Sequence, residues 1–299
     1  MSAYRISTIT ATGSLNSEVD LDVLYGGLSC YLGGDVKESI VNDVIYIEFG
    51  KNRKDMGHLR KFINRQMRMM SSTKRFDNQV TIVYKLKIND MTCMLNTKVF
   101  KNGNVQMTGI RSIDQGRQMI DIIISIIKHM CDNGYNCVET PSELESKDYK
   151  LRLINSDFKI GYQIHRDNLF KILLRNDATC SFEPCIYPAV KIKYYYNSDN
   201  DRKDGVCYCS KKCMIGKSAG SGDMCCKKVT IAVFQSGCVI ITGGQSIEQI
   251  NEAYQYILSV LTDNIDKVKK KIVLVHAPKL EQKQSVRVMV KASAILPYS

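Results

Sequence analysis

Five cysteines in one short stretch are the residues best suited to hold a metal ion. Cys207, Cys209 and Cys213 are separated by one and three residues, and Cys225 and Cys226 follow after eleven more. Four thiolates can close a tetrahedral Zn²⁺ site, and a polar loop rich in Gly and Ser would gain order from it. This spacing is irregular for a zinc site, however, since zinc-binding loops usually place two residues between ligands. Three interpretations stay open: a zinc site, free thiols in a mobile loop, or a disulfide.

Other residue types give little support for catalysis. The four histidines are dispersed, and the sequence contains no P-loop, His-Glu-x-x-His motif or nucleophile elbow. The seven remaining cysteines stand singly, and each is expected to be a small core or surface residue. We therefore expect a protein that is not an enzyme.

An internal repeat constrains the fold more strongly than any single motif. Residues 100–115 and 234–249 share Phe, then Gly three residues later, Val two after that, Thr-Gly, and Ser-Ile-acid-Gln, all at an offset of 134. In each copy this pattern predicts a strand ending at Phe100 or Phe234, a tight turn and a returning strand.

A helix is expected after each hairpin. Ser112 and Ser246 occupy N-cap positions, with Gln115 and Gln249 three residues further on. This is the spacing of a capping box, in which two free backbone amides are satisfied reciprocally. Apolar residues then recur at helical spacing in both copies.

A fainter repeat lies upstream. Residues 19–24 and 164–169 share an aliphatic residue followed by Asp and Leu, at an offset of 145, and each follows a possible strand at 6–12 or 150–156. The two offsets differ, so we expect the copies to differ by insertions.

Together these residues resemble the TATA-box-binding protein family. Its repeats carry Phe-x-x-Gly-x-x-x-x-Thr-Gly before a helix, as at 100–109 and 234–243, and its second repeat carries a motif similar to Ser-Phe-Glu-Pro-Cys-Ile-Tyr-Pro-Ala-Val at 181–190. The resemblance extends over about residues 5–30, 76–135, 149–196 and 228–262.

The resemblance implies an α+β fold in which two pseudo-symmetric repeats form one curved antiparallel sheet, a saddle with helices on its convex face. Residues 1–140 would form the first repeat, with a basic insertion at about 31–75. Residues 141–263 would form the second, with a Cys-rich stirrup insertion at about 197–228 that flanks DNA, and residues 264–299 a basic tail.

It also implies a transcription initiation factor that binds A·T-rich promoter DNA in the minor groove, bends it, and recruits a factor IIB-like protein and RNA polymerase. In this family apolar side chains enter between base steps and kink the duplex. By their match to the motif these wedges are Phe100, Phe234, Tyr187 with its neighbour Pro188, and Phe76. The alternative for strand-end aromatics is that they fill the core.

Strand alternation assigns the remaining candidate contacts. If Val105 and Met107 face the helices, Gln106 and Thr108 face the opposite side. The same argument in the second repeat and the match to the family complete the set of candidate DNA-binding residues: Gln106, Thr108, Ile240, Thr242, Thr8 and Lys193.

The departures from the family pattern concern specificity. The central asparagine pair of the family aligns with Thr8 and Leu153, and only Asn155, two residues along, could substitute if the register slips. We therefore expect bending of A·T-rich DNA rather than strict TATA selection. A rival interpretation is a protein-interaction scaffold that keeps the saddle but has lost sequence-specific DNA binding.

The net charge of +12 favours polyanionic partners, but it is unevenly distributed. Residues 51–75 hold nine Lys/Arg against one Asp, and residues 264–299 hold eight against two acidic residues. The first segment is expected to be either a basic helix around 59–70 or a solvated loop.

No stretch approaches 18 consecutive apolar residues, and the N-terminal residues contain no apolar signal region. We therefore expect neither a membrane partner nor secretion, and a location in the nucleus or in an intracellular viral factory. Large insertions in a divergent factor would suit a large DNA virus.

Overall fold

The computed structural model describes residues 3–32, 40–55, 77–88, 91–211, 213, 218–221 and 225–270. In the first half the elements are β1 (Arg5–Ser14), α1 (Leu21–Tyr31), the 3₁₀ turn η1 (Ile40–Asp43), β2 (Val44–Phe49), β3 (Asn52–Asp55), β4 (Gln79–Ile88), β5 (Met91–Phe100), β6 (Asn104–Ile110) and α3 (Ile113–Asp132). In the second half they are η2 (Pro141–Glu143), β7 (Lys147–Lys159), α4 (Arg166–Arg175), β8 (Thr179–Ser181), β9 (Ala189–Tyr196), β10 (Lys227–Phe234), β11 (Cys238–Gly244), α5 (Ile247–Asp263) and α6 (Ile265–Val268).

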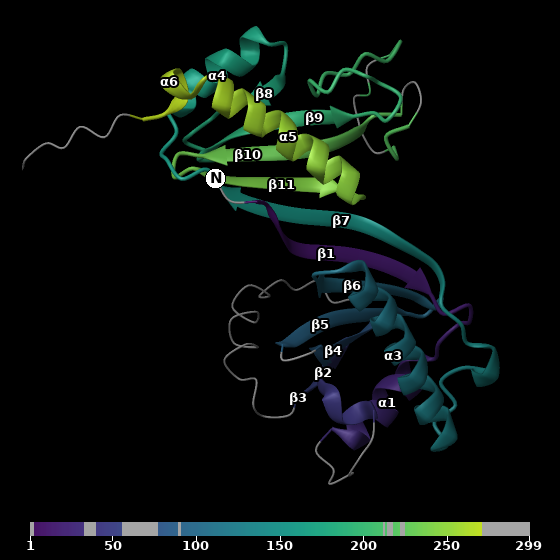
Figure 1. Ribbon diagram of the computed structural model, residues 1–299. Coiled ribbons are helices and arrows are strands. Elements are labelled where there is room, and N and C mark those ends of the chain that lie inside the picture. The colour runs from purple at the N-terminus through teal and green to yellow at the C-terminus, as the bar shows by residue number, and fades with distance from the viewer. Residues whose placement is uncertain are drawn as a thin grey trace, which may run out of the picture.

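The described strands form one antiparallel sheet of 11 strands, in the order β3-β2-β4-β5-β6-β1-β7-β11-β10-β9-β8 (Figure 1). This order is symmetric about the central pair β1 and β7. Strands β6, β5, β4 and β2 on one side correspond to β11, β10, β9 and β8 on the other, and β3 is an additional outer strand. The expected saddle of two repeats is confirmed.

The strand register shows the same symmetry residue by residue. Thr10 on β1 lies opposite Thr108 on β6, and Asn155 on β7 lies opposite Thr242 on β11. Thr10 and Asn155 are 145 residues apart and Thr108 and Thr242 are 134 apart, which are the two offsets found in the sequence. The upstream repeat, faint in sequence, is therefore structural.

Each hairpin turn packs against the segment that follows the central strand of its repeat. A Cβ atom at Gly103 (φ +74°) would lie 1.9 Å from the Ser17 carbonyl oxygen, and one at Gly237 (φ +81°) would lie 2.2 Å from that of Tyr162. Both the backbone conformation and the lack of space therefore require glycine.

The caps of α3 and α5 differ slightly from the expected capping box. Ser112 Oγ and Ser246 Oγ each accept a hydrogen bond, at 3.3 Å, from the backbone amide of Gln115 and Gln249. Each glutamine Oε1 accepts, at 2.8 Å, from the amide of the residue before the serine rather than from the serine itself. Each helix start is therefore still held by two side-chain hydrogen bonds, one accepted by the serine and one accepted by the glutamine.

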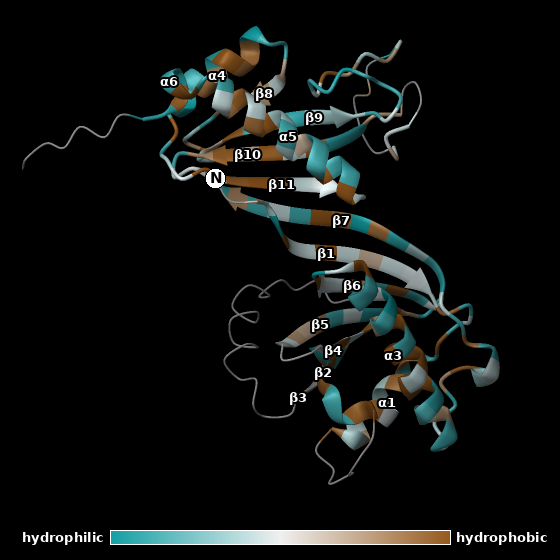
Figure 2. Cartoon of the chain, in the orientation of Figure 1, coloured by the Kyte–Doolittle hydropathy of each residue, from teal (hydrophilic) through white to brown (hydrophobic). Residues whose placement is uncertain are grey.

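The helices of both repeats lie on one face of the curved sheet (Figure 1). Val105 and Met107 are fully buried on this face, whereas Gln106 and Thr108 are half-buried on the other, as the alternation predicts. Figure 2 shows bands of hydrophobic and hydrophilic residues along β7. We call the face without described helices the open face. In the described part of the chain no helix is long and apolar enough to span a membrane.

The expected insertion and tail are shorter than the sequence analysis placed them. Within the range 31–75, residues 44–49 and 52–55 form β2 and β3, because β2 pairs with β4 as an ordinary member of the sheet. The tail was expected from 264, but α6 packs on the second repeat with Val268 fully buried. The expected basic helix at 59–70 lies outside the described residues.

Candidate nucleic-acid interface

The centre of the open face is formed by β1 and β7. Thr8 lies opposite Asn155 and Thr10 lies opposite Leu153, without a register shift between the two pairs. Thr8 and Leu153 therefore remain the equivalent central positions, and the register slip that would place Asn155 there does not occur. Asn155 is instead the equivalent of Thr10, and an apolar Leu153 side chain occupies one central position.

The next strands outward add a pair of threonines with different partners. Thr242 Oγ1 donates a hydrogen bond to the side-chain oxygen of Asn155, which lies opposite it. Thr108 Oγ1 donates to the backbone carbonyl of Asn96 at 3.4 Å. The Oδ1 atom of Asn96 is buried without a hydrogen-bond partner in the described part of the chain. Sequence reasoning did not select Asn96, although it lies opposite Thr108 on the same face.

The second repeat ends its open face in an aromatic pair. The rings of Phe234 and Tyr187 are 5.8 Å apart, centroid to centroid, at 62° to each other. Lys191 Nζ lies 4.0 Å from the centre of the Tyr187 ring, a cation–π contact. Both aromatic residues are half-buried, while Pro188 is exposed and its carbonyl accepts a hydrogen bond from Arg166. The pair is therefore available to a ligand at one end of the face.

The first repeat places Phe100 at the equivalent position. Phe100 is half-buried and lines a hollow of about 430 Å³ that also contains Gln106, Lys150 and Arg152. Neither Phe100 nor Phe234 belongs to the hydrophobic core, so the interpretation of these rings as core residues is wrong. Phe76, the expected partner of Phe100, lies outside the described residues.

Basic side chains surround this polar and aromatic surface. The strand register puts Lys193 opposite Thr230 and Lys191 opposite Ala232, and both lysines are exposed. Sequence reasoning found only Lys193, although the two-residue spacing along a strand would have added Lys191. The basic residues that we assign to the open face are Lys85, Lys98, Lys150, Arg152, Lys191, Lys193 and Lys228.

The two remaining candidates lie on the predicted face as well. Ile240 is half-buried opposite Asp157, whose carboxylate pairs with Arg5 at 3.0 Å. Gln106 lies opposite Thr12, whose hydroxyl accepts a hydrogen bond from Arg152 Nε at 2.8 Å. The predicted face is confirmed for both residues, and their contact with DNA stays a prediction.

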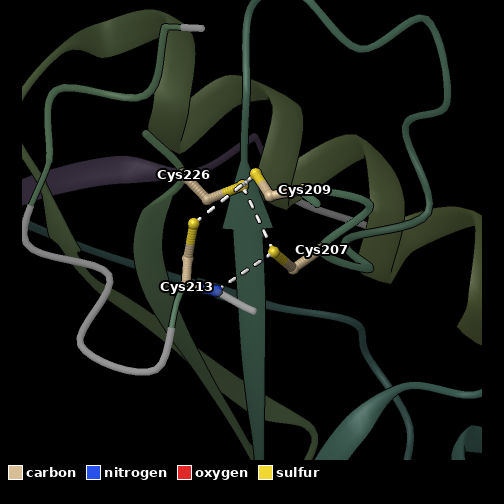
Figure 3. Close-up of side chains that lie close together, drawn as sticks. All are labelled: Cys207, Cys209, Cys213 and Cys226. Atoms are coloured by element: carbon tan, nitrogen blue, oxygen red, sulfur yellow. Dashed lines mark hydrogen bonds between the residues drawn. The ribbon is translucent and has the colours of Figure 1, made fainter. Parts of the chain in front are cut away.

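The cysteines lie at the edge of this surface, near Tyr195, where the β9–β10 connection leaves the sheet. The thiols of Cys207, Cys209, Cys213 and Cys226 lie within 4.8 Å of one another and point toward a common centre (Figure 3). Cys225 was expected to share this site, but it is not in the cluster. Successive side chains of an extended segment point to opposite sides, so Cys226 can reach the cluster and its neighbour cannot.

The environment of these thiols separates their acidities. Burial raises the pKa of Cys207, but hydrogen bonds from the backbone amides of Cys213 and Cys209 and from neighbouring thiols outweigh it and bring the pKa down to about 7. Burial raises the pKa of Cys226, and its hydrogen bonds to Cys209 and Cys207 raise it further. The cluster therefore already stabilises at least one thiolate.

This geometry defines a class of protein: a two-repeat saddle whose open face carries hydroxyl and amide groups at its centre, aromatic rings toward its ends and basic residues around them. Comparisons with known proteins narrow the class. The family model described as "Transcription factor TFIID (or TATA-binding protein, TBP)" matches residues 168–264. The chain is 31% identical over 276 residues to a TATA-box-binding protein-like protein of Acanthamoeba polyphaga mimivirus, a match that covers 89% of this chain and 66% of that protein, just under two thirds.

Two further comparisons are more distant. TATA-box-binding protein 2 of Entamoeba histolytica is 23% identical over 230 residues, covering 77% of this chain and 83% of the relative. A solved structure of the Methanococcus jannaschii TBP aligns with 88% of this chain and 99% of its own, at 17% identity and a TM-score of 0.45. Over most of its length the chain is thus similar to TATA-box-binding proteins and TATA-box-binding protein-like proteins.

Proposed function

We propose that the open face binds the minor groove of A·T-rich promoter DNA and bends it, and that the protein acts as a transcription initiation factor without enzymatic activity. One observation carries the proposal: Phe100 and Phe234 occupy equivalent strand ends on the open face, and neither belongs to the core. Apolar rings so placed can enter between base steps at two separated points, and two such kinks bend a duplex around the sheet.

The chemistry between the rings suits a minor groove. A·T pairs present only acceptors there, and the hydroxyl groups of Thr8 and Thr10 and the amide of Asn155 can donate to acceptors. Basic side chains such as Lys191 and Lys193 extend from the same face and would neutralise phosphates. The contacts to phosphate would position the duplex, and the contacts to the groove floor would select its composition.

The proposed preference is for A·T-rich DNA in general. Leu153 cannot donate a hydrogen bond at one of the two central positions, so half of the central readout is apolar. Shape and deformability of the DNA would then carry more of the specificity than direct base contacts do.

Gel-shift titration of the full-length protein tests this proposal. An A·T-rich and a G·C-rich duplex of equal length are compared at one salt concentration, with and without a drug that fills the A·T minor groove. We expect tighter binding to the A·T-rich duplex, competition by the drug, and weaker binding by Phe234→Ala. Equal binding to both duplexes without competition would refute minor-groove recognition.

We further propose that the DNA-bound protein recruits a factor IIB-like protein and RNA polymerase, in the nucleus or in an intracellular viral factory. Similarity to TATA-box-binding proteins supports this part of the proposal. A supershift of the protein–DNA complex by a factor IIB-like protein from the same genome tests recruitment, and imaging of tagged protein in infected or transfected cells tests location. Absence of a supershift would argue against recruitment.

Leu153 also favours a second candidate function, a scaffold that keeps the saddle but no longer reads DNA sequence. A scaffold would bind A·T-rich and G·C-rich duplexes equally weakly and would still bind its protein partners. The gel-shift titration separates the two functions, because only the initiation factor requires the aromatic wedges.

A further inference from the structure

We propose that Cys207, Cys209, Cys213 and Cys226 form a structural Zn²⁺ centre that fastens the β9–β10 insertion to the second repeat. None of its four ligands is a candidate DNA contact, so the centre does not depend on the DNA-binding proposal. Three of the four thiols come from the middle of the insertion, at residues 207–213, and the fourth comes from the residue before β10.

The distances match those of a tetrahedral thiolate site. A Zn–S bond of about 2.3 Å places two sulfurs of a tetrahedron about 3.8 Å apart. The Sγ atoms of Cys209 and Cys226 are 3.4 Å apart, those of Cys209 and Cys213 3.5 Å, and those of Cys207 and Cys226 3.7 Å. Four sulfur ligands leave no open position, which is the arrangement of a structural rather than a catalytic zinc.

The surroundings contribute N–H groups that point at sulfur. The backbone amide of Cys213 donates to Cys207 Sγ at 3.4 Å, and Asn197 Nδ2 donates to Cys226 Sγ at 3.8 Å. Such donors stabilise the thiolate form and orient metal ligands. Cys226 is also almost fully buried, at 1% exposed, while Cys207, Cys209 and Cys213 are half-buried, so the metal would be shielded from water on the Cys226 side.

The rest of the insertion explains what the metal would fix in place. Gln249 Nε2, on the first turn of α5, donates to the Ala219 carbonyl at 2.8 Å, and Lys203 pairs with Glu252 of the same helix at 3.1 Å. Glu252 also accepts a hydrogen bond from the buried Tyr194 hydroxyl at 2.6 Å. The insertion thus contacts α5 on the helix face through polar groups. A metal that joins residues 207–213 to Cys226 would supply the order that a small apolar core cannot.

Metal content of the full-length protein, expressed with zinc and purified under reducing conditions without chelators, tests the proposal. Cys209→Ser removes one ligand, and Cys225→Ser is the matched control because Cys225 adjoins Cys226 but lies outside the cluster. We expect about one zinc per chain in the wild type and in Cys225→Ser, and a loss to background in Cys209→Ser.

Cobalt substitution gives a readout that needs no ligand variant. Co²⁺ added to the chelator-treated wild type and to Cys225→Ser should produce the thiolate-to-cobalt charge-transfer and visible bands of a tetrahedral four-sulfur site, and zinc should abolish them. Chelation should also speed proteolytic cleavage within residues 197–226. Wild type that binds neither metal, wild type with a disulfide among these four cysteines, or Cys209→Ser with undiminished zinc would each overturn the proposal.

Discussion

Asn155 accepts a hydrogen bond from the Thr242 hydroxyl at the centre of the open face, whereas the equivalent hydroxyl of Thr108 donates to a backbone carbonyl. The strand register is symmetric at these positions, but the side-chain chemistry is not. The two repeats would therefore read their halves of a bound duplex with different groups. An asymmetric floor of this kind can bias the orientation in which the protein sits on a promoter.

Restoring a donor at the apolar central position should strengthen recognition. Leu153→Asn places an amide opposite Thr10, and one added hydrogen bond of about 1 kcal/mol corresponds to roughly fivefold tighter binding to A·T-rich DNA. Leu174→Asn, at an exposed position of α4 on the helix face, is the matched control and should leave binding unchanged. Fluorescence anisotropy on both duplexes measures the change. An equal gain on G·C-rich DNA would show that the centre does not read the groove floor.

Removing an aromatic wedge should weaken binding by about tenfold or more, because the ring no longer offsets the loss of base stacking at the kink. Phe234→Ala tests this at the ring that pairs with Tyr187. Leu174→Ala deletes a comparable apolar side chain, 52% exposed on the helix face, and should bind normally. Equal affinities of the two variants for A·T-rich DNA would remove Phe234 from the interface.

Exposed lysines of the open face should contribute through phosphate contact. Lys193→Ala is expected to lower the dependence of log Kd on log salt by about one and to weaken binding to all duplexes alike. Lys171→Ala, an exposed lysine of α4, serves as the control on the other face. If Lys171→Ala lowered the salt dependence and Lys193→Ala did not, the DNA would bind on the helix face, which would contradict our account.

The two hairpin turns share a close approach of glycine to a backbone carbonyl, so glycine should be indispensable at both. Gly237→Ala forces a Cβ to 2.2 Å from the Tyr162 carbonyl at a φ of +81°, and we expect a loss of about 3–5 kcal/mol in the free energy of unfolding. Gly134→Ala has a similar φ of +86° with no atom within 4 Å, so it should lose only about 1–2 kcal/mol. Urea denaturation measures both. Similar losses would mean that backbone strain alone, and not the close approach, explains the glycine.

The repeat made the fold and much of the candidate site predictable from sequence. A hairpin that ends in Phe and returns through Val-x-x-Thr-Gly fixes the faces of Phe100, Thr108 and their equivalents, because strand alternation has a strict period of two. Nothing in a local pattern says which strand lies opposite Asn155, since long-range register depends on packing across the whole sheet. Its partnership with Thr242 was therefore not foreseen.

The insertions are harder to predict from sequence, again because their structure depends on long-range packing. A charge run does not show where a sheet resumes, so β2 and β3 were assigned to the basic insertion. The cysteine spacing pointed to metal chemistry but could not say which four of five thiols converge. That choice depends on the direction of the side chain at the start of β10, and it excludes Cys225.

The angle of the DNA in the complex tests the central claim most directly. Energy transfer between dyes at the two ends of an A·T-rich duplex should increase when the wild-type protein saturates it, because kinks at Phe100 and Phe234 bring the ends together. The double variant Phe100→Ala/Phe234→Ala, at concentrations where it too is bound, should leave the transfer near that of free DNA. An unchanged end-to-end distance with saturating wild-type protein, or equal bending by the double variant, would contradict the account.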